Sequence, residues 1–129
     1  EVKKELEHLA EQAFECGEPN IPEDLSQAVK IAADYAARHY REAVGLGDAA
    51  EAAGVNSTYL SYLFSQEMGI GFANYLLNLR MEHAKKLLRE TNLKMWQVAE
   101  ESGFNDYHYF SKVFKKAEGM SPAQYRKHS

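Results

Sequence analysis

Residues Gly103–Arg126 read GFNDYHYFSKVFKKAEGMSPAQYR and predict a helix that follows a tight glycine turn. Asp106 is expected to cap this helix, because its carboxylate can accept a hydrogen bond from an amide of the first turn. Four side chains at helical spacing predict the buried face, namely Phe110, Val113, Phe114 and Ala117. Four others share the opposite face, namely His108, Ser111, Lys112 and Lys115. A short helix over Met95–Glu101 precedes the glycine, so the whole stretch is typical of a helix-turn-helix unit.

The distribution of charge matters more here than the total. The 129 residues are 45% hydrophobic, which is enough for one compact domain with a real core. The net charge of −4 argues against a nucleic-acid partner when it is taken whole. However, residues 1–24 sum to −6 and residues 25–69 to −2, while residues 70–129 sum to +4. The positive charge therefore gathers in the half that contains the stretch above, and local charge is what a phosphate backbone feels.

Several features bear on the location of the protein. The apolar runs are only a few residues long, so no membrane partner is expected. The chain starts EVKKELE, without a signal peptide or an initiator Met, which predicts a piece of a longer protein. Its single cysteine, Cys16, allows no internal disulfide and fits a reducing compartment, so we expect a cytoplasmic protein.

Residues 1–22 form the first part of the predicted organisation, an acidic helical linker. Apolar residues alternate by four and three at Val2, Leu6, Leu9, Ala13 and Cys16, as in the seam of a coiled coil. This appended helix either lies on the domain or ends a dimerisation or signalling helix from an upstream part. The segment Gly17–Pro22 carries two prolines and a glycine that break it. A domain boundary is therefore placed here, and residues 23–129 are expected to form the functional domain.

Seven helices are expected in residues 23–129, which makes the fold all-α. A first core helix runs from about residue 23 to 40, and Asp48 is expected to cap a short one over Ala49–Ala53. Asn56 is expected to cap a helix that ends near Met68 and buries Tyr59, Leu60, Leu63 and Phe64. The exposed face of that helix is expected to carry Thr58, Ser61, Tyr62 and Ser65. A long linker helix covers about residues 72–90, and a last short helix follows Ser121 and Pro122.

The chain contains one internal repeat. At an offset of 50 residues, six positions are identical, pairing Tyr59, Ser61, Phe64, Gly69, Ala73 and Tyr75 with Tyr109, Ser111, Phe114, Gly119, Ala123 and Tyr125. Before the turn the offset is 49, so the second copy has one extra turn residue. Three outward positions differ, with Tyr62, Ser65 and Gln66 in the first copy opposite Lys112, Lys115 and Lys116 in the second. The pattern predicts two helix-turn-helix units, at about residues 48–69 and 95–117, with different outward chemistry.

With its joining segment FANYLLNLRMEHAKKLL and its closing motif over Gly103–Arg126, the chain resembles the DNA-binding domain of AraC/XylS-type transcription regulators. The resemblance covers about residues 25–127. It implies a seven-helix domain in which one linker helix joins two helix-turn-helix units, and it implies that both recognition helices enter successive major-groove segments of double-stranded DNA. At 1.5 Å per residue, ~19 residues give a linker helix of roughly 28 Å, compatible with the ~34 Å between successive major grooves.

The resemblance, carried over by position, implies two sets of contacts. The residues expected at base edges are Thr58, Ser61 and Tyr62 in the first unit and Tyr107, His108, Ser111 and Lys112 in the second. The residues expected at phosphates are Lys115, Lys116 and the cap positions Asn56 and Asp106, through their helix N-terminal amides. Tyr62, Ser65 and Gln66 depart from the basic residues usual in the family, so the first unit should supply less electrostatic binding.

No chemistry of catalysis or metal binding stands out. The five histidines lack ligand spacing, and no P-loop, GxSxG or HExxH motif occurs, so no enzyme, cofactor or metal site is expected.

Two function classes remain, a sequence-specific regulator of transcription and a helical module for protein–protein contact. The resemblance favours the regulator, as an activator with RNA polymerase as partner. An upstream part would hold a ligand-binding barrel or a phosphorylatable receiver, and the acidic helix favours the receiver of a response regulator. Homodimers could form through that part.

Overall fold

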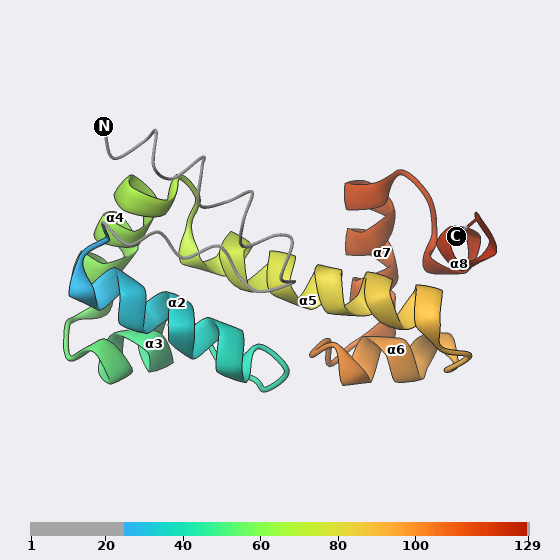
Figure 1. Ribbon diagram of the computed structural model, residues 1–129, viewed down its shortest axis with the longest axis horizontal. Helices are drawn as coiled ribbons and strands as arrows, with labels where there is room; N and C mark the ends of the chain where they lie inside the picture. The colour runs from blue at the N-terminus through green and yellow to red at the C-terminus, as the bar shows by residue number, and fades with distance from the viewer. Residues whose placement is uncertain (1–24, 129) are drawn as a thin grey trace. The chain divides into compact units, whose positions relative to one another are not determined.

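The computed structural model describes residues 25–128, and every regular element in that range is a helix (Figure 1). There are seven of them, α2 (Gln27–His39), α3 (Leu46–Ala53), α4 (Ser57–Met68), α5 (Phe72–Glu90), α6 (Met95–Glu101), α7 (Tyr107–Glu118) and α8 (Pro122–His128). The predicted all-α domain of seven helices is confirmed. The predicted helix over residues 1–22 lies outside the described residues.

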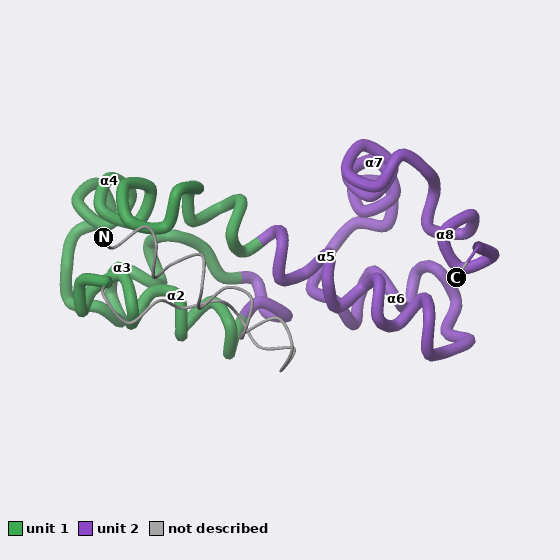
Figure 2. Tube along the Cα trace, turned by 45° about the horizontal axis from the view of Figure 1, so that its top comes forward, with its two compact units in different colours: residues 1–39, 44–76 green, residues 40–43, 77–129 purple. Residues whose placement is uncertain are grey.

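The chain divides into two compact units, drawn in different colours in Figure 2. Within the described residues, unit 1 holds α2, α3, α4 and the start of α5, as residues 25–39 and 44–76. Unit 2 holds the rest of α5, together with α6, α7 and α8. It also holds residues 40–43, the first part of the loop that joins α2 to α3, although both of those helices belong to unit 1. Each unit therefore contains one of the two predicted helix-turn-helix motifs.

Unit 1 packs small residues of α2 and α3 against the larger apolar side chains of α4 and α5. Its buried residues are Leu25, Val29, Ala32, Ala33, Ala36, Ala49, Ala50, Leu60, Phe64, Phe72, Tyr75 and Leu76. Phe64 lies at the centre, with the rings of Phe72 and Tyr75 each 5.4 Å away in edge-on geometry. The carboxylate of Glu67 accepts hydrogen bonds from the amide and hydroxyl of Ser26, so α4 supplies an anion to the N-terminus of α2.

Unit 2 also has an aromatic core, built around Phe104, Phe110 and Phe114. Its hydrophobic cluster consists of Met81, Ala84, Leu88, Val98, Ala99, Phe104, Phe110 and Phe114. The half-buried Lys85 of α5 bridges Glu82 at 3.1 Å and Glu118 at 3.3 Å, and the second of these links α5 to the end of α7. Arg126 of α8 donates to the carbonyl oxygens of Leu88 and Leu93, which satisfies a carbonyl of the last turn of α5.

Several local expectations were wrong. The first core helix starts at Gln27 rather than near residue 23. The short third helix starts at Leu46, with Gly45 as its N-cap, so Asp48 is not the cap. Asp48 instead occupies the third helical position and accepts from the Gly45 amide at 2.9 Å, which allows the helix to begin three residues earlier than expected.

The expected burial was wrong at two helix positions. Ala117 of α7 is exposed, because the inward position of the last turn is taken by Glu118, which is half-buried and pairs with Lys85. Tyr59 of α4 is 50% exposed rather than buried. None of the described helices is long and apolar enough to cross a membrane.

Candidate nucleic-acid interface

The turns that lead into α4 and α7 are built by the same hydrogen bonds. In unit 1 the amide of Val55 donates to Ala50 at 3.0 Å, and in unit 2 the amide of Phe104 donates to Ala99 at 2.8 Å. Each turn passes through a glycine of positive φ, 73° at Gly54 and 103° at Gly103. One residue separates Gly54 from the cap of α4, and two separate Gly103 from the cap of α7, as the change of offset from 49 to 50 predicted.

Both predicted caps of these two helices are confirmed. The Asn56 side chain accepts from the Tyr59 amide at 2.7 Å, and the Asp106 carboxylate accepts from the His108 amide at 2.9 Å. A side-chain cap satisfies an amide that would otherwise lack a partner, so it fixes where each helix begins. The first turns of α4 and α7 are thereby presented at the surface in a defined orientation.

The predicted contact residues of unit 1 gather on α4. Asn56, Thr58, Ser61 and Tyr62 are all exposed there, and the Tyr62 side chain is 64% exposed. The sequence of α4, STYLSYLFSQEM, contains no lysine or arginine. This surface can offer hydroxyl groups, an amide and aromatic rings to a partner, but no positive charge.

The predicted contact residues of unit 2 gather on α7. Tyr107, His108 and Lys112 are exposed, whereas Ser111 is half-buried, which leaves its hydroxyl less available than the others. Lys115 and Lys116 are exposed and lie in the last turn of the helix. Cations at that end complement the helix dipole, so these two lysines also stabilise α7 itself. The cap residue Asp106 is exposed as well, and its carboxylate would repel a phosphate, so any phosphate contact there falls to backbone amides.

Two exposed tyrosines on these helices were not among the predicted contact residues. Tyr59 and Tyr109 occupy the third position of α4 and α7, and their side chains are 50% and 52% exposed. The apolar periodicity led to Tyr59 being placed in the core, because it adjoins Leu60. The repeat itself carried the missing signal, since the same aromatic residue stands at the same distance from both caps.

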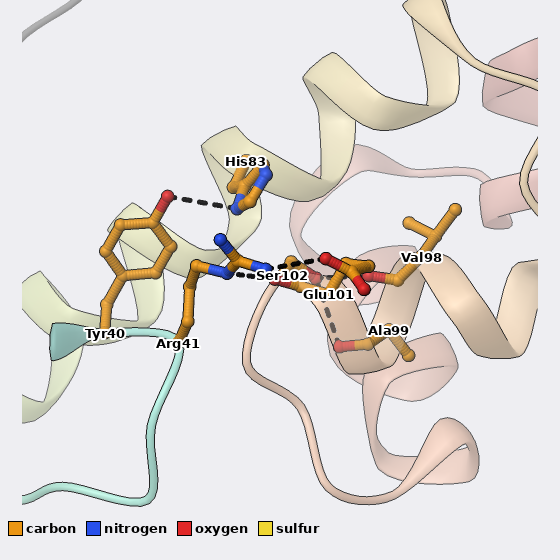
Figure 3. Close-up of polar contacts among 7 residues, drawn as sticks. All are labelled: Tyr40, Arg41, His83, Val98, Ala99, Glu101 and Ser102. Atoms are coloured by element: carbon orange, nitrogen blue, oxygen red, sulfur yellow. Dashed lines mark hydrogen bonds and ion pairs between the residues drawn. The ribbon is translucent and has the colours of Figure 1, made fainter.

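Hydrogen bonds from Arg41 and Arg80, which we call the clamp, hold the turn between α6 and α7 and were not predicted. Figure 3 shows the bonds of Arg41. The guanidinium of Arg41 donates to the Glu101 carbonyl oxygen at 2.8 Å and to its carboxylate at 2.6 Å. Arg80 of α5 donates to the carbonyl oxygens of Tyr40 and Glu42, at 2.7 and 3.0 Å. We call residues 40–43 the strap, because these bonds tie them to the end of α6 and to α5.

Gly103 lies directly under the strap. A Cβ atom at this position would lie 2.5 Å from the Tyr40 carbonyl oxygen and 3.1 Å from the Arg41 Cα. Its φ of 103° is also one that side chains with a Cβ rarely adopt. The glycine therefore serves both the turn and the close approach of the strap, four residues before α7 begins at Tyr107.

A scan against protein-family models matches residues 49–128, more than half of the chain, to the family described as helix-turn-helix domain. The chain belongs to the AraC-type helix-turn-helix DNA-binding family. The resemblance drawn from the sequence is therefore confirmed, and so is the expectation that this is no enzyme, since the family is one of transcription regulators.

Curated relatives and solved structures agree with this. The AraC-type domain is 39% identical over 120 residues to the uncharacterised HTH-type transcriptional regulator YisR of Bacillus subtilis, covering 93% of this chain and 40% of that protein. It is 30% identical over 122 residues to the arabinose operon regulatory protein of Escherichia coli, covering 94% and 42%. It is also similar to the C-terminal domain of AraT, a response regulator from Geobacillus stearothermophilus, at 41% identity and a TM-score of 0.79. That match covers 82% of this chain and 88% of the other.

In the AraC-type domain, the pKa values of two residues beside the clamp of unit 2, His83 and Tyr40, are shifted. Burial lowers the pKa of His83, and the positive charges of Arg41 and Lys86 lower it further against the opposing effect of Glu101. The His83 Nδ1 lies 3.0 Å from the Tyr40 hydroxyl, whose own pKa is raised by burial (Figure 3). A neutral imidazole with an unprotonated Nδ1 can accept a hydrogen bond from the Tyr40 hydroxyl in this arrangement. No group of three or more potential metal ligands occurs among residues 25–128.

Proposed function

We propose that the chain is the DNA-reading part of a longer transcription regulator and binds double-stranded DNA with sequence specificity through α4 and α7. The observation that carries the proposal is the pair of matched turns, each leading into a side-chain-capped helix whose first three residues are exposed. Exposed N-terminal turns are what a helix-turn-helix protein inserts into a major groove. Membership of a DNA-binding family supports the same function.

The predicted contact residues divide into two roles in this proposal. Those at base edges are Thr58, Ser61 and Tyr62 of α4 and Tyr107, His108, Ser111 and Lys112 of α7. Lys112 suits guanine, because an ammonium group can donate to O6 and N7 together. Lys115, Lys116 and the helix N-terminal amides beside Asn56 and Asp106 are assigned to phosphates. We propose that α4 and α7 enter successive major-groove segments.

The relatives bear on the remainder of the regulator. The chain spans 40% and 42% of the length of the two curated relatives described above. The domain that receives the regulatory signal is therefore expected in another part of the full-length protein. We propose a receiver of the response-regulator type there, since the AraT match is the C-terminal domain of a response regulator. We further propose that the full-length regulator is a cytoplasmic activator that contacts RNA polymerase. Its dimers would form through the upstream part.

A salt titration of duplex binding tests the central claim. Sites are first selected from random duplexes with the isolated chain, and the affinity for a selected site and for a scrambled one is then measured over a range of salt. Binding to DNA predicts that log K falls linearly with log salt, and specificity predicts a gap between the two duplexes. A folded chain that binds neither duplex even at low salt would contradict the proposal and would favour the protein–protein module instead.

The two units should contribute unequally to the salt dependence. Lys115→Ala removes an exposed cation from α7, so we expect the slope of log K against log salt to fall by about one. Ser65→Ala changes the matched position of α4, which carries no charge, and should leave the slope unchanged. Equal slopes for both variants would show that the charge asymmetry between α4 and α7 has no part in binding.

A further inference from the structure

The exposed face of α4 differs in kind from that of α7. Its two largest exposed side chains are Tyr59 and Tyr62, at 50% and 64% exposure. They are three residues apart, so on a helix they lie on the same side about one turn apart. No lysine or arginine stands anywhere in α4, and unit 1 as described carries two basic and four acidic side chains.

The backbone holds these two rings at the end of the helix that approaches DNA. Tyr59 is the third residue of α4, and its amide donates to the cap side chain of Asn56 at 2.7 Å. Tyr62 lies one turn further on, before the buried Phe64. Both rings are therefore carried on a capped and well-packed first half of the helix, where a recognition helix makes its base contacts.

Only some features of the major groove suit an uncharged aromatic face. Guanine presents two acceptors, O6 and N7, which favour a cation, and α4 has none to offer. Thymine presents its C5-methyl group, which makes apolar contacts and is absent from the other bases. Burying a methyl group against a ring needs no charge and no exact hydrogen-bond geometry.

We propose that α4 reads thymine, with the rings of Tyr59 and Tyr62 packed against C5-methyl groups in the major groove. The proposal rests on the DNA-binding function proposed above and names the base preference of its first unit. At the matched positions, α7 carries Tyr109 and Lys112. The second unit therefore keeps one ring and replaces the other by a cation, which directs it to guanine. The selected site should accordingly combine a thymine-bearing half with a guanine-bearing half.

A different use of the same residues would be a hydrogen bond from each tyrosine hydroxyl to a phosphate. That contact would depend on the hydroxyl and would be blind to the base. Contact between the ring and a methyl group depends on the ring and on the thymine methyl, so the two uses respond oppositely to two single changes. Tyr62→Phe removes only the hydroxyl, and replacing thymine by uracil in the duplex removes only the methyl group.

The test begins with the site selected by the unaltered chain. Each thymine of this duplex is replaced in turn by uracil, which keeps base pairing, and the affinity is measured by titration. We expect one or two positions at which uracil weakens binding by about fourfold, the value for one buried methyl-sized group. A selected site in which no thymine responds to this replacement would overturn the proposal without the use of any protein variant.

Protein variants then assign the effect to α4. Tyr62→Ser and Tyr59→Ser should each lower the affinity for the selected site. At one of the sensitive positions, each variant should bind the duplex with thymine and the duplex with uracil equally well. Tyr62→Phe should retain the full discrimination, and Lys112→Ala, which alters the other unit, should retain it too. Both tyrosines are exposed, and the helical circular dichroism of each variant checks its folding.

The outcomes separate the two levels of the argument. Duplex binding with a loss of affinity in Tyr62→Phe and no response to uracil would mark a phosphate contact and overturn the thymine proposal, while the DNA-binding function stands. Discrimination that survives both serine variants would place the methyl contact elsewhere and overturn the proposal as well. Absence of binding to any duplex would overturn both proposals together.

Discussion

Units 1 and 2 share a backbone plan and differ in what they present. Each has a turn with a positive-φ glycine, a side-chain cap, and a recognition helix that ends at a left-handed glycine, Gly69 or Gly119. Each packs a tyrosine edge-on against a buried phenylalanine at 5.4 Å, Tyr75 on Phe64 and Tyr125 on Phe114. The exposed faces share Tyr59 and Tyr109 but otherwise differ in charge, since α4 has Tyr62, Ser65 and Gln66 where α7 has Lys112, Lys115 and Lys116. Backbone geometry and surface chemistry have therefore varied independently in this chain.

The supports of the two turns also differ. In unit 2 the strap and two arginines hold the turn, and the strap leaves no room for a Cβ atom at Gly103. In unit 1, a Cβ atom at Gly54 would meet nothing within 4 Å. Glycine is thus required at position 54 only by its positive φ. At position 103 it is required both by its positive φ and by the close contact with the strap. Four predictions sharpen or break this comparison.

The largest effect is expected for Gly103→Ala. The left-handed backbone costs ~1–2 kcal/mol, and the clash with the Tyr40 carbonyl adds a penalty like that of an overpacked core, so we expect a loss of about 3 kcal/mol in the free energy of unfolding. Gly54→Ala is the matched control, and it should cost only the ~1–2 kcal/mol of the left-handed backbone, because the angle alone opposes it. Urea denaturation of both variants measures this, and equal losses would refute the special role of the strap.

Lys112→Ala should produce the next largest effect, on DNA binding rather than on stability. We expect a loss of ~1–3 kcal/mol in binding free energy and a relaxed preference at one base pair. The measurement is the affinity for the selected site and for variants at each position. A loss that is equal on every sequence would instead identify Lys112 as a phosphate contact, and the two units would then differ in charge but not in reading.

The tyrosine hydroxyls of the two cores give a smaller contrast. The Tyr75 hydroxyl is buried without a hydrogen-bond partner among the described residues, and burial followed by the charge of Asp34 raises its pKa to about 12. Tyr75→Phe should therefore leave stability unchanged or raise it by up to ~1 kcal/mol. The Tyr125 hydroxyl accepts from Arg89 at 3.0 Å, so Tyr125→Phe should cost ~0.5–1 kcal/mol. Thermal unfolding compares them, and a larger loss for Tyr75→Phe would reverse the expected order.

The smallest effect concerns pH and unit 2. Because the pKa of His83 is lowered in the folded state, the unfolded chain binds a proton more readily. The stabilising contribution is complete above the unfolded pKa of ~6.5, and it is lost as the pH falls from there through the folded pKa. In His83→Gln, the fall in stability between pH ~6.5 and 5 should be shallower than in the unaltered chain. An unchanged pH profile would show that His83 does not titrate differently on folding.

Features that depend on a few neighbouring residues could be predicted from the sequence. The caps Asn56 and Asp106 and the one-residue difference between the turns were predicted because capping and turn geometry are local. The burial of Phe64 and Phe114 followed from helical spacing. The exposure of Tyr59 did not, because a large aromatic residue beside an apolar stripe fits either face of the helix until neighbouring helices are placed.

The strap was beyond the reach of the sequence for another reason. Arg41 and Glu101 are 60 residues apart, and Arg80 and Tyr40 are 40 apart, so no periodic pattern connects them. The bonds run mainly to carbonyl oxygens, which every residue possesses, and a backbone acceptor leaves no trace in side-chain identity. The start of α3 was missed because Gly45 and Gly47 flank Leu46 and glycine is a poor helix former, and the bond from Gly45 to Asp48 outweighs that propensity.

The strap also determines how the two reading units can be exchanged between regulators. Unit 2 is not one continuous segment, because residues 40–43 belong to it while the rest begins at residue 77. A chimaera joined at residue 77 would combine the second half of one protein with a strap from another, and Gly103, Arg80 and Glu101 would meet foreign partners. The segment that can be exchanged as a unit therefore comprises residues 77–128 together with residues 40–43 of the loop between α2 and α3.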